Sequence, residues 1–213
     1  MKSIADIRND YTLAGLDESD LDGDPIAQFD RWMTDAIKAQ VFEPTAMSLA
    51  TATGDGQPHS RIVLLKHFDE QGFCFFTNYD SAKGREMEEN SRASICIHWP
   101  PLERQVRIEG IISKTTVVES DAYFTRRPRG SQLGAWVSQQ SSEIASRQVL
   151  EKLLTEITAK FEGKPVTRPP HWGGYRLKPA LIEFWQGRQS RLHDRLLYTA
   201  QPDGAWKIAR LAP

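Results

Sequence analysis

The 213-residue sequence has little cysteine, no long apolar run and almost no net charge. Cys74 and Cys96 are its only cysteines, and each stands in an apolar run typical of a strand. We therefore expect two buried thiols, with neither a disulfide nor a cysteine metal site. No apolar run approaches the roughly 18 residues needed to cross a bilayer. The net charge of −1 gives no general attraction to nucleic acid or anionic membranes, so any anion site must be built locally.

Several common chemistries lack their motifs. The sequence has no Gly-rich P-loop, no dinucleotide fingerprint, no metalloprotease helix and no Gly-x-Ser-x-Gly elbow, and we expect no bound metal. Residues 1–6 lack the apolar core of a secretory signal. We therefore expect a cytoplasmic protein with no membrane or nucleic-acid partner.

The pattern along the chain predicts an N-terminal arm over residues 1–24 and one domain over residues 25–213. Asp24 and Pro25 are typical of a helix start, and apolar residues follow at helical spacing. From Ala46 the period changes to that of strands. Expected strands are 46–52, 59–67, 72–77, 93–99, 103–118, 175–183, 191–199 and 206–211. Further expected helices start at Ser81 and span 120–126, 131–137 and 142–161. Many antiparallel strands with helices in the connections favour a barrel or closed sheet with peripheral helices.

The segment Arg191–Arg195 reads RLHDR. On a strand, alternation would place Arg191, His193 and Arg195 on one face and Leu192 on the other. A surface strand tolerates such a face. The alternative is that these cations face a phosphorylated or electron-rich ligand, because burying cations without an anion is costly.

Two further segments combine cations with strand or helix ends. Arg61 and Lys66 bracket the apolar run Ile62–Leu65, and strict alternation puts them on opposite faces, so both reach one site only if a bulge or strand end redirects one. Lys83 lies in the first turn of the helix that Ser81 should cap, where a cation opposes the helix dipole unless an anion is present. Solvated surface positions are the alternative for both segments.

Tyr123, Arg127 and Ser131 recur every four residues around the helix break at Pro128. If Ser131 caps the following helix, a phenol, a guanidinium, a hydroxyl and backbone amides could converge on one phosphate. Chance clustering of arginines is the alternative.

Taken together, these segments resemble the pyridoxine/pyridoxamine 5′-phosphate oxidases, the flavin enzymes that complete vitamin B6 salvage. The likeness extends in order from Tyr11 to Pro213. The matching segments are Arg61–Lys66, Leu102–Val106, Arg126–Val137, Ser138–Ser142, Ile182–Gly187 and Arg191–Arg195.

The resemblance implies a β-rich α+β fold, a split β-barrel that forms a homodimer with FMN between the subunits. It implies oxidation of pyridoxine or pyridoxamine 5′-phosphate to pyridoxal 5′-phosphate by O2, with H2O2 as product and NH3 released from the amine. The residues that it assigns to FMN are Arg61, Ile62, Val63, Leu64, Leu65, Lys66, Phe76, Thr77, Lys83, Gln105, Gln140, Ser141, Trp185 and Arg195. The residues that it assigns to the substrate are Arg8, Asn9, Asp10, Tyr11, Lys66, Tyr123, Arg127, Ser131, Arg191, Leu192 and His193.

Within that site the resemblance makes Arg191 and His193 the catalytic residues, lying against the pyridine ring. We expect hydride transfer from substrate C4′ to flavin N5, with Arg191 stabilising developing charge. His193 would fix the 3-hydroxyl or the 4′ substituent, and the sequence leaves open whether it also takes a proton. One position departs from the family: Ala82 stands where an arginine commonly binds the flavin phosphate.

Two alternatives share parts of this pattern. A flavin oxidase of the phenazine-biosynthesis type has the same fold and the RLH core, but the residues Tyr123, Arg127 and Ser131 favour a B6 phosphate. A protein that binds FMN or a B6 phosphate without catalysis would bind flavin and consume no oxygen.

Overall fold

The computed structural model describes residues 3–4 and 10–213. Its contacts group these residues into two compact units. The first unit holds the described residues up to Leu49, Ser94–Gly110 and Pro179–Pro213, and the second holds Ala50–Ala93 and Ile111–Lys178. The single domain expected over residues 25–213 stays a prediction.

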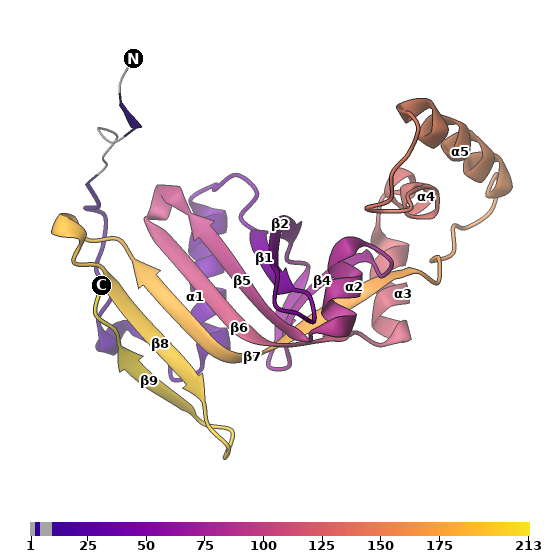
Figure 1. Ribbon diagram of the computed structural model, residues 1–213. Helices are drawn as coiled ribbons and strands as arrows, with labels where there is room; N and C mark the ends of the chain where they lie inside the picture. Colours follow the sequence, from indigo (N-terminus) through magenta and orange to yellow (C-terminus); the bar gives the residue numbers. More distant parts are fainter. Residues whose placement is uncertain (1–2, 5–9) are drawn as a thin grey trace. The chain divides into compact units, whose positions relative to one another are not determined.

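The described part of the chain alternates short strands with helices (Figure 1). Its α-helices are α1 (Pro25–Lys38), α2 (Ala82–Glu89), α3 (Val117–Arg126), α4 (Arg129–Val137) and α5 (Arg147–Lys160). Its strands are β1 (Ala46–Ala52), β2 (Pro58–Leu64), β3 (His67–Asp69), β4 (Gly72–Asn78), β5 (Arg92–Trp99), β6 (Arg104–Lys114), β7 (Trp172–Gln186), β8 (Asp194–Ala200) and β9 (Trp206–Arg210). Three 3-10 helices are η2 (Glu18–Asp20), η3 (Pro100–Leu102) and η4 (Gln189–Arg191).

The strands form a β-sheet, as the period-2 pattern predicts. Among the described residues their order is β2-β1-β5-β6-β7-β4-β3, while β8 pairs with β7 and β9 with β8. The pairs β3–β4, β4–β7, β7–β8 and β8–β9 are antiparallel. No helix within residues 3–4 and 10–213 has the length and apolarity that a membrane span requires.

In the first unit, α1 begins as its sequence predicts. The Asp24 side chain accepts a hydrogen bond from the Ile26 amide at 2.9 Å, and Pro25 occupies the first turn. Phe29, Trp32 and Met33 are buried, and the Trp32 ring meets Phe184 of β7 edge-on with 5.1 Å between ring centroids. Ile37, one of the apolar residues that follow Pro25 at helical spacing, is exposed.

The expected strand over residues 191–199 starts three residues late. Gln189–Arg191 forms a 3-10 turn, and β8 begins only at Asp194. Ser190 and Arg191 both have left-handed backbone with φ near 60°, which a strand cannot contain. The prediction that Arg191, His193 and Arg195 share one strand face is therefore wrong, because a local turn replaces the assumed period.

In the second unit, α3 and α4 differ from expectation at their starts. Helix α3 begins at Val117 behind a capping box in which Thr116 and Glu119 exchange hydrogen bonds, so the preceding strand ends at Lys114 rather than 118. Helix α4 begins at Arg129 with Pro128 at the N-cap, and Ser131 lies inside its first turn. The predicted capping role of Ser131 is therefore wrong, because Pro128 already fixes the backbone for helix entry.

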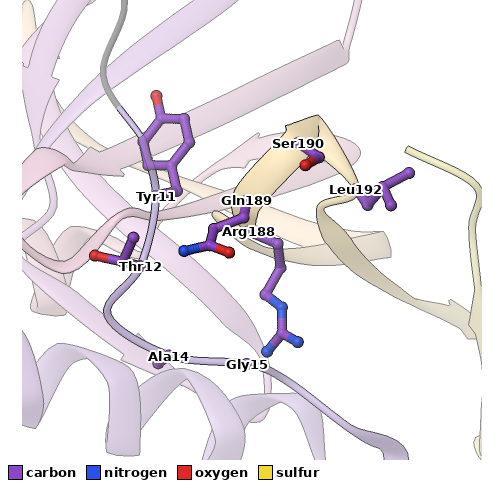
Figure 2. A pocket seen from close by; sticks show the side chains of 8 residues that line it. All are labelled: Tyr11, Thr12, Ala14, Gly15, Arg188, Gln189, Ser190 and Leu192. Carbon is purple, nitrogen blue, oxygen red and sulfur yellow. The ribbon is translucent and has the colours of Figure 1, made fainter.

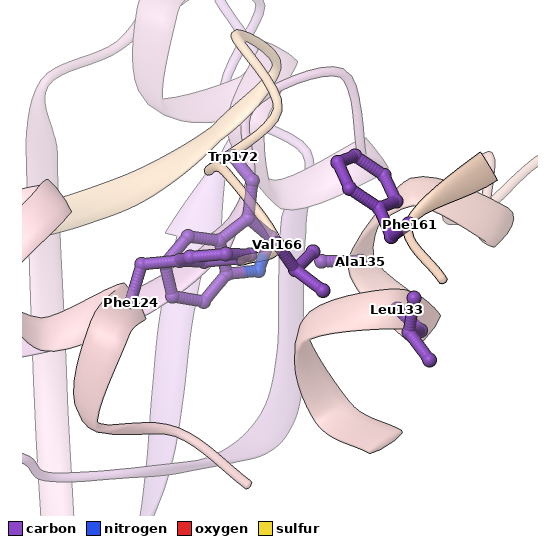
Figure 3. Packing of buried hydrophobic residues seen from close by; sticks show 6 residues of the cluster. All are labelled: Phe124, Leu133, Ala135, Phe161, Val166 and Trp172. Carbon is purple, nitrogen blue, oxygen red and sulfur yellow. The ribbon is translucent and has the colours of Figure 1, made fainter. Parts of the chain in front are cut away.

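Helices α4 and α5 lie side by side in the second unit (Figure 1). Here α5 begins at Arg147, five residues later than expected, and none of its own residues is buried. Ile144, Val149 and Leu154 are apolar residues within the range 142–161 expected to be helical, yet they are exposed. Phe161, just beyond the helix, is buried. A buried cluster forms the core beside α4 (Figure 3): Phe124, Leu133, Ala135, Phe161, Val166 and Trp172.

Neither cysteine forms a disulfide. Cys74 is buried and Cys96 half-buried, and both thiols are free. Burial raises the pKa of Cys74 to about 11 and also raises the pKa of Cys96, so both remain protonated near neutral pH.

Candidate functional site

A cavity of about 460 Å³ lies within the second unit. It gathers residues that are scattered through more than 100 positions of sequence, including members of three of the four predicted cationic segments. Its lining is Arg61, Ile62, Val63, Leu64, Lys66, Phe76, Thr77, Lys83, Tyr123, Arg127, Gln140, Ser141 and Trp172. We call it the second-unit cavity.

A break between two strands brings Arg61 and Lys66 to this cavity. Strand β2 ends at Leu64 and β3 begins at His67, so strict alternation stops before Lys66. The Lys66 amide donates to the Cys74 carbonyl at 2.8 Å, which fixes the chain at this break. The strand end required for both cations to reach one site is therefore present. Leu65 is buried and does not line the cavity.

Lys83 is a buried cation with neutral partners. Its Nζ donates to Gln140 Oε1 at 3.0 Å and to the hydroxyls of Thr77 and Ser81, each at 3.3 Å. Burial lowers the pKa of Lys83, and the nearby Arg61 guanidinium lowers it further. Ser81 caps α2 as predicted, accepting from the Gly84 amide. An anion bound here would offset the repulsion between Lys83 and Arg61.

Arg61 is held by a carboxylate that sequence inspection missed. Its Nη2 lies 2.8 Å from Glu86 Oε2, and its Nη1 also contacts the Thr51 hydroxyl. Glu86 is buried and lies 3.1 Å from His59 Nδ1 through its other oxygen. The pKa of Glu86 is lowered, because hydrogen bonds from Thr51 and Arg61 outweigh its burial. Glu86 thus fixes the position of the Arg61 side chain.

Arg127 lies on a stack of aromatic rings. Phe76 and Tyr123 are parallel with 3.9 Å between ring centroids, and Phe76 also stacks on Trp172 at 5.7 Å. The Arg127 guanidinium carbon lies 4.4 Å from the centroid of Trp172, a cation–π contact. Its Nη1 atom is buried and has no hydrogen-bond partner among the described residues, and burial lowers the pKa of Arg127. A buried guanidinium nitrogen without a partner costs free energy, which an anion bound to it would offset.

Ser131 was predicted to converge with Tyr123 and Arg127 on one phosphate, but it is not part of the cavity lining. It is exposed in the first turn of α4. Trp172, by contrast, lines the cavity and was missed. In the sequence, Trp172 is marked only by the two glycines that follow it. In the structure, a Cβ at Gly173 would collide with the Tyr79 side chain, and a Cβ at Gly174 would collide with the Thr115 side chain.

The predicted catalytic pair lies in the first unit, on the turn between β7 and β8. A cavity of about 550 Å³ opens beside this turn, between Tyr11–Gly15 of the arm and residues 188–192 (Figure 2). Arg191 and Leu192 are exposed, and His193 is half-buried. These residues share a turn rather than a strand face.

Aromatic contacts order the surroundings of His193. Its ring centroid lies 4.6 Å from Trp185 and 5.5 Å from Tyr11, and Tyr11 also meets Trp185 edge-on at 5.7 Å. Gly187 permits this arrangement, because a Cβ there would lie 2.7 to 2.9 Å from atoms of Tyr11. Two hydrogen bonds hold the arm in place, because the backbone amides of Thr12 and Leu13 donate to the Glu103 carboxylate at 3.3 and 3.1 Å. Tyr11, Trp185 and His193 therefore form one group.

The remaining predicted site residues have mixed settings. Arg195 makes a two-pronged ion pair with the buried Glu183, at 2.8 and 3.1 Å, and donates to the Ala212 carbonyl at 2.9 Å. Gln105 is half-buried on β6 and Asp10 is exposed. Arg8 and Asn9 lie outside the described residues.

The sequence and the fold of this chain are similar to those of known proteins. Residues 33–161 match the family model described as pyridoxamine 5′-phosphate oxidase. Residues 172–213 match the model described as the pyridoxine 5′-phosphate oxidase C-terminal dimerisation region. The solved structure of PhzG from Burkholderia lata, in complex with tetrahydrophenazine-1-carboxylic acid, is 35% identical with a TM-score of 0.87, covering 92% of this chain and 95% of its own. The fold is the split barrel that the family resemblance implies.

Curated proteins of similar sequence indicate which family the chain belongs to. The pyridoxine/pyridoxamine 5′-phosphate oxidase of Cupriavidus pinatubonensis is 57% identical over the full length of both chains. That of Rubrobacter xylanophilus is 56% identical over 100% of this chain and 97% of its own. The chain belongs to the pyridoxine/pyridoxamine 5′-phosphate oxidase family, a family of oxidoreductases.

Proposed function

We propose that this protein uses FMN to oxidise pyridoxine 5′-phosphate and pyridoxamine 5′-phosphate to pyridoxal 5′-phosphate. Molecular oxygen is the final acceptor and yields H2O2, and the amine substrate also releases NH3. The supporting observation is the second-unit cavity, where an unpaired Arg127 nitrogen, Lys66 and the buried Lys83 share one space. The family membership of the chain supports the same reaction.

The residues of the cavity fit the phosphate of FMN. The Lys83 ammonium donates only to neutral oxygens in its three described hydrogen bonds, and Arg61 adds a second cation that Glu86 holds in place. An anionic phosphate would complete these donors. The residues that would hold the flavin here are Arg61, Ile62, Val63, Leu64, Lys66, Thr77, Lys83, Gln140 and Ser141. When bound, FMN would accept the hydride from substrate C4′ at its N5 atom and pass the electrons to oxygen.

The substrate phosphate would bind at the other end of the cavity. Lys66 and Arg127 supply charge, and the Tyr123 hydroxyl supplies a donor whose raised pKa, caused mainly by burial, keeps it protonated. Ser131 remains a predicted partner from the next helix turn. Binding energy from the phosphate, which does not react, would orient the reacting carbon.

A second copy of the chain would complete the site. Arg191, His193 and Trp185 belong to the first unit, and all lie in the segment that matches the dimerisation model. We propose that these residues, with Gln105 and Arg195, approach the second-unit cavity of the partner subunit in a homodimer. Arg191 would then lie over the pyridine ring and stabilise charge that develops there. This sharing explains why one chain carries the two residue groups in different units.

The phenazine type of oxidase is the competing function, because PhzG has the same fold at 35% identity. The unpaired Arg127 beside Lys66 favours a substrate that carries a phosphate, and the curated relatives at 54–58% identity favour the B6 phosphates.

The test is an assay on purified protein saturated with FMN under air. Each B6 phosphate should yield pyridoxal 5′-phosphate and an equal amount of peroxide, whereas unphosphorylated pyridoxine should react poorly. A protein that binds flavin but leaves both phosphates unchanged would contradict the proposal. Turnover of a dihydrophenazine carboxylate in their place would establish the competing function.

A further inference from the structure

A hydrogen bond joins Arg188 to His193 across the turn between β7 and β8. The backbone amide of Arg188 donates to His193 Nδ1 with 3.1 Å between the two nitrogens. Between them, Ser190 and Arg191 both adopt left-handed backbone, with φ of 57° and 60°, a conformation that L-residues rarely take. Figure 2 shows this turn from Arg188 to Leu192. The backbone is thus held in an unusual shape at the point where the amide meets the imidazole.

This bond fixes which imidazole nitrogen holds the proton. A backbone N–H can only donate, so Nδ1 must accept and therefore carries no proton. In a neutral imidazole the other nitrogen, Nε2, then carries it. An imidazolium would have a proton on Nδ1 as well, and that proton would point at the Arg188 amide hydrogen.

We infer that His193 acts as the Nε2–H tautomer, donating a hydrogen bond to the substrate rather than removing a proton from it. This inference rests on the proposed function and settles a question that the sequence leaves open. In the oxidation, a hydride leaves C4′ for the flavin and a proton leaves the 4′ oxygen or nitrogen. That proton passes to solvent, because Nε2 already holds one and Nδ1 is occupied by the Arg188 amide. The Nε2–H group donates to an oxygen of the substrate and orients its ring.

The surroundings of His193 support a neutral ring. The rings of Trp185 and Tyr11 contact it from β7 and from the arm, which fixes its plane. Among the charged neighbours, Arg191 disfavours a second proton and Asp194 favours one. Burial and Arg191 together outweigh Asp194, so the pKa of His193 is lowered.

The first test reads the tautomer directly in the free holoprotein. Nitrogen NMR of protein labelled with 15N-histidine distinguishes protonated from unprotonated ring nitrogens, and the His193→Gln variant assigns the His193 signals among the five histidines. We expect Nε2 protonated and Nδ1 unprotonated at neutral pH. A proton on Nδ1 would overturn the inference, whatever the activity of the enzyme.

The second test compares two amide replacements of His193. The amide of glutamine reaches the position of Nε2 and can donate there, whereas the shorter asparagine reaches only the position of Nδ1. Neither can act as a base. We expect His193→Gln to keep kcat within about tenfold of wild type and His193→Asn to lose more. A catalytic base would contribute about 100-fold or more, so an equal loss of that size in both variants, at normal FMN content, would refute the donor role.

The two failures are distinguishable. If the protein oxidises neither B6 phosphate, the proposed function fails while the NMR assignment can still hold. If it oxidises both but the NMR shows a proton on Nδ1, the function stands and the tautomer inference fails.

Discussion

Arg127 is the residue whose setting most directly indicates a ligand. Its guanidinium rests on Trp172, and its Nη1 is buried without a hydrogen-bond partner in the described part of the chain. Such a group costs free energy unless something anionic binds to it. The neighbouring Arg126 is exposed and offers a matched comparison.

Replacing Arg127 should weaken binding of the phosphorylated substrate. A charge-assisted hydrogen bond contributes about 1.5–3 kcal/mol, so Arg127→Ala should raise KM for pyridoxamine 5′-phosphate about 10- to 150-fold with a smaller change in kcat. Arg126→Ala should leave both constants near wild type. Initial rates at varied substrate concentration measure this, and an unchanged KM in Arg127→Ala would remove Arg127 from the phosphate site.

Ala82 stands where the family resemblance implies an arginine that binds the flavin phosphate. It lies half-buried at the start of α2, next to Lys83. Arg85, one turn further on, is exposed, donates to the Asp80 carbonyl and does not line the cavity. Arg85 therefore contributes no cation to the lining of the second-unit cavity.

Introducing an arginine at position 82 should tighten FMN binding. Ala82→Arg adds one charge-assisted contact and should lower the Kd of FMN about 10- to 100-fold, measured by quenching of flavin fluorescence during titration of the apoprotein. Ala82→Leu adds bulk without charge and should not tighten binding. Equal affinities for Ala82→Arg and the parent protein would show that the flavin phosphate lies elsewhere.

At the scale of elements, the sequence predicts best where the cause is local. Asp24 and Ser81 cap α1 and α2 as expected, because a cap depends on a few neighbouring residues. The turn at Ser190 and Arg191 could not be predicted, since nothing in these residue types signals left-handed backbone. The exposure of Val149 and Leu154 on α5 is likewise set by what surrounds the helix rather than by its period.

The candidate site was predictable to a similar degree. The cavity collects Arg61, Lys66 and Lys83 because a strand end and a helix cap place them there, and both features have sequence signals. Trp172 and Glu86 were missed, since each joins the site through contacts with distant segments. Ser131 was misassigned as a cap because Pro128 starts the helix earlier.

The start of α3 gives a pH-dependent prediction at this scale. Hydrogen bonds from Thr116 and then Arg176 lower the pKa of Glu119 to about 2, from an ordinary value of 4.5. A lowered carboxylate pKa stabilises the fold above pH 4.5, and this stabilisation is lost as pH falls toward 2. Glu119→Gln should therefore reduce the free energy of unfolding at pH 7 by roughly 0.2–1 kcal/mol, since Glu119 is partly exposed, and the difference should shrink below pH 4.5.

Thermal unfolding of both proteins from pH 7 to pH 3 measures this difference. Glu151→Gln, which removes an exposed ion pair with Arg147 on α5, should change stability little and serves as the control. A difference for Glu119→Gln that is constant with pH would mean that the carboxylate charge contributes nothing.

At the scale of the whole molecule, the proposed site needs two copies of the chain. The residues proposed to bind phosphate lie in the second unit, and the residues proposed to face the substrate ring lie in the first unit, within the segment matching the dimerisation model. Two-fold symmetry would give a dimer two identical sites, each built from the second unit of one subunit and the first unit of the other.

A hybrid dimer tests this central claim most directly. Subunits carrying Arg127→Ala and Arg191→Ala, coexpressed with different affinity tags and purified through both, should form dimers with one doubly altered site and one intact site. At low substrate concentration we predict about half of wild-type activity, although each variant alone is nearly inactive. A hybrid of Arg127→Ala with Lys66→Ala, both in the second unit, should show no such recovery. Inactivity of the first hybrid, with FMN bound, would contradict the shared site.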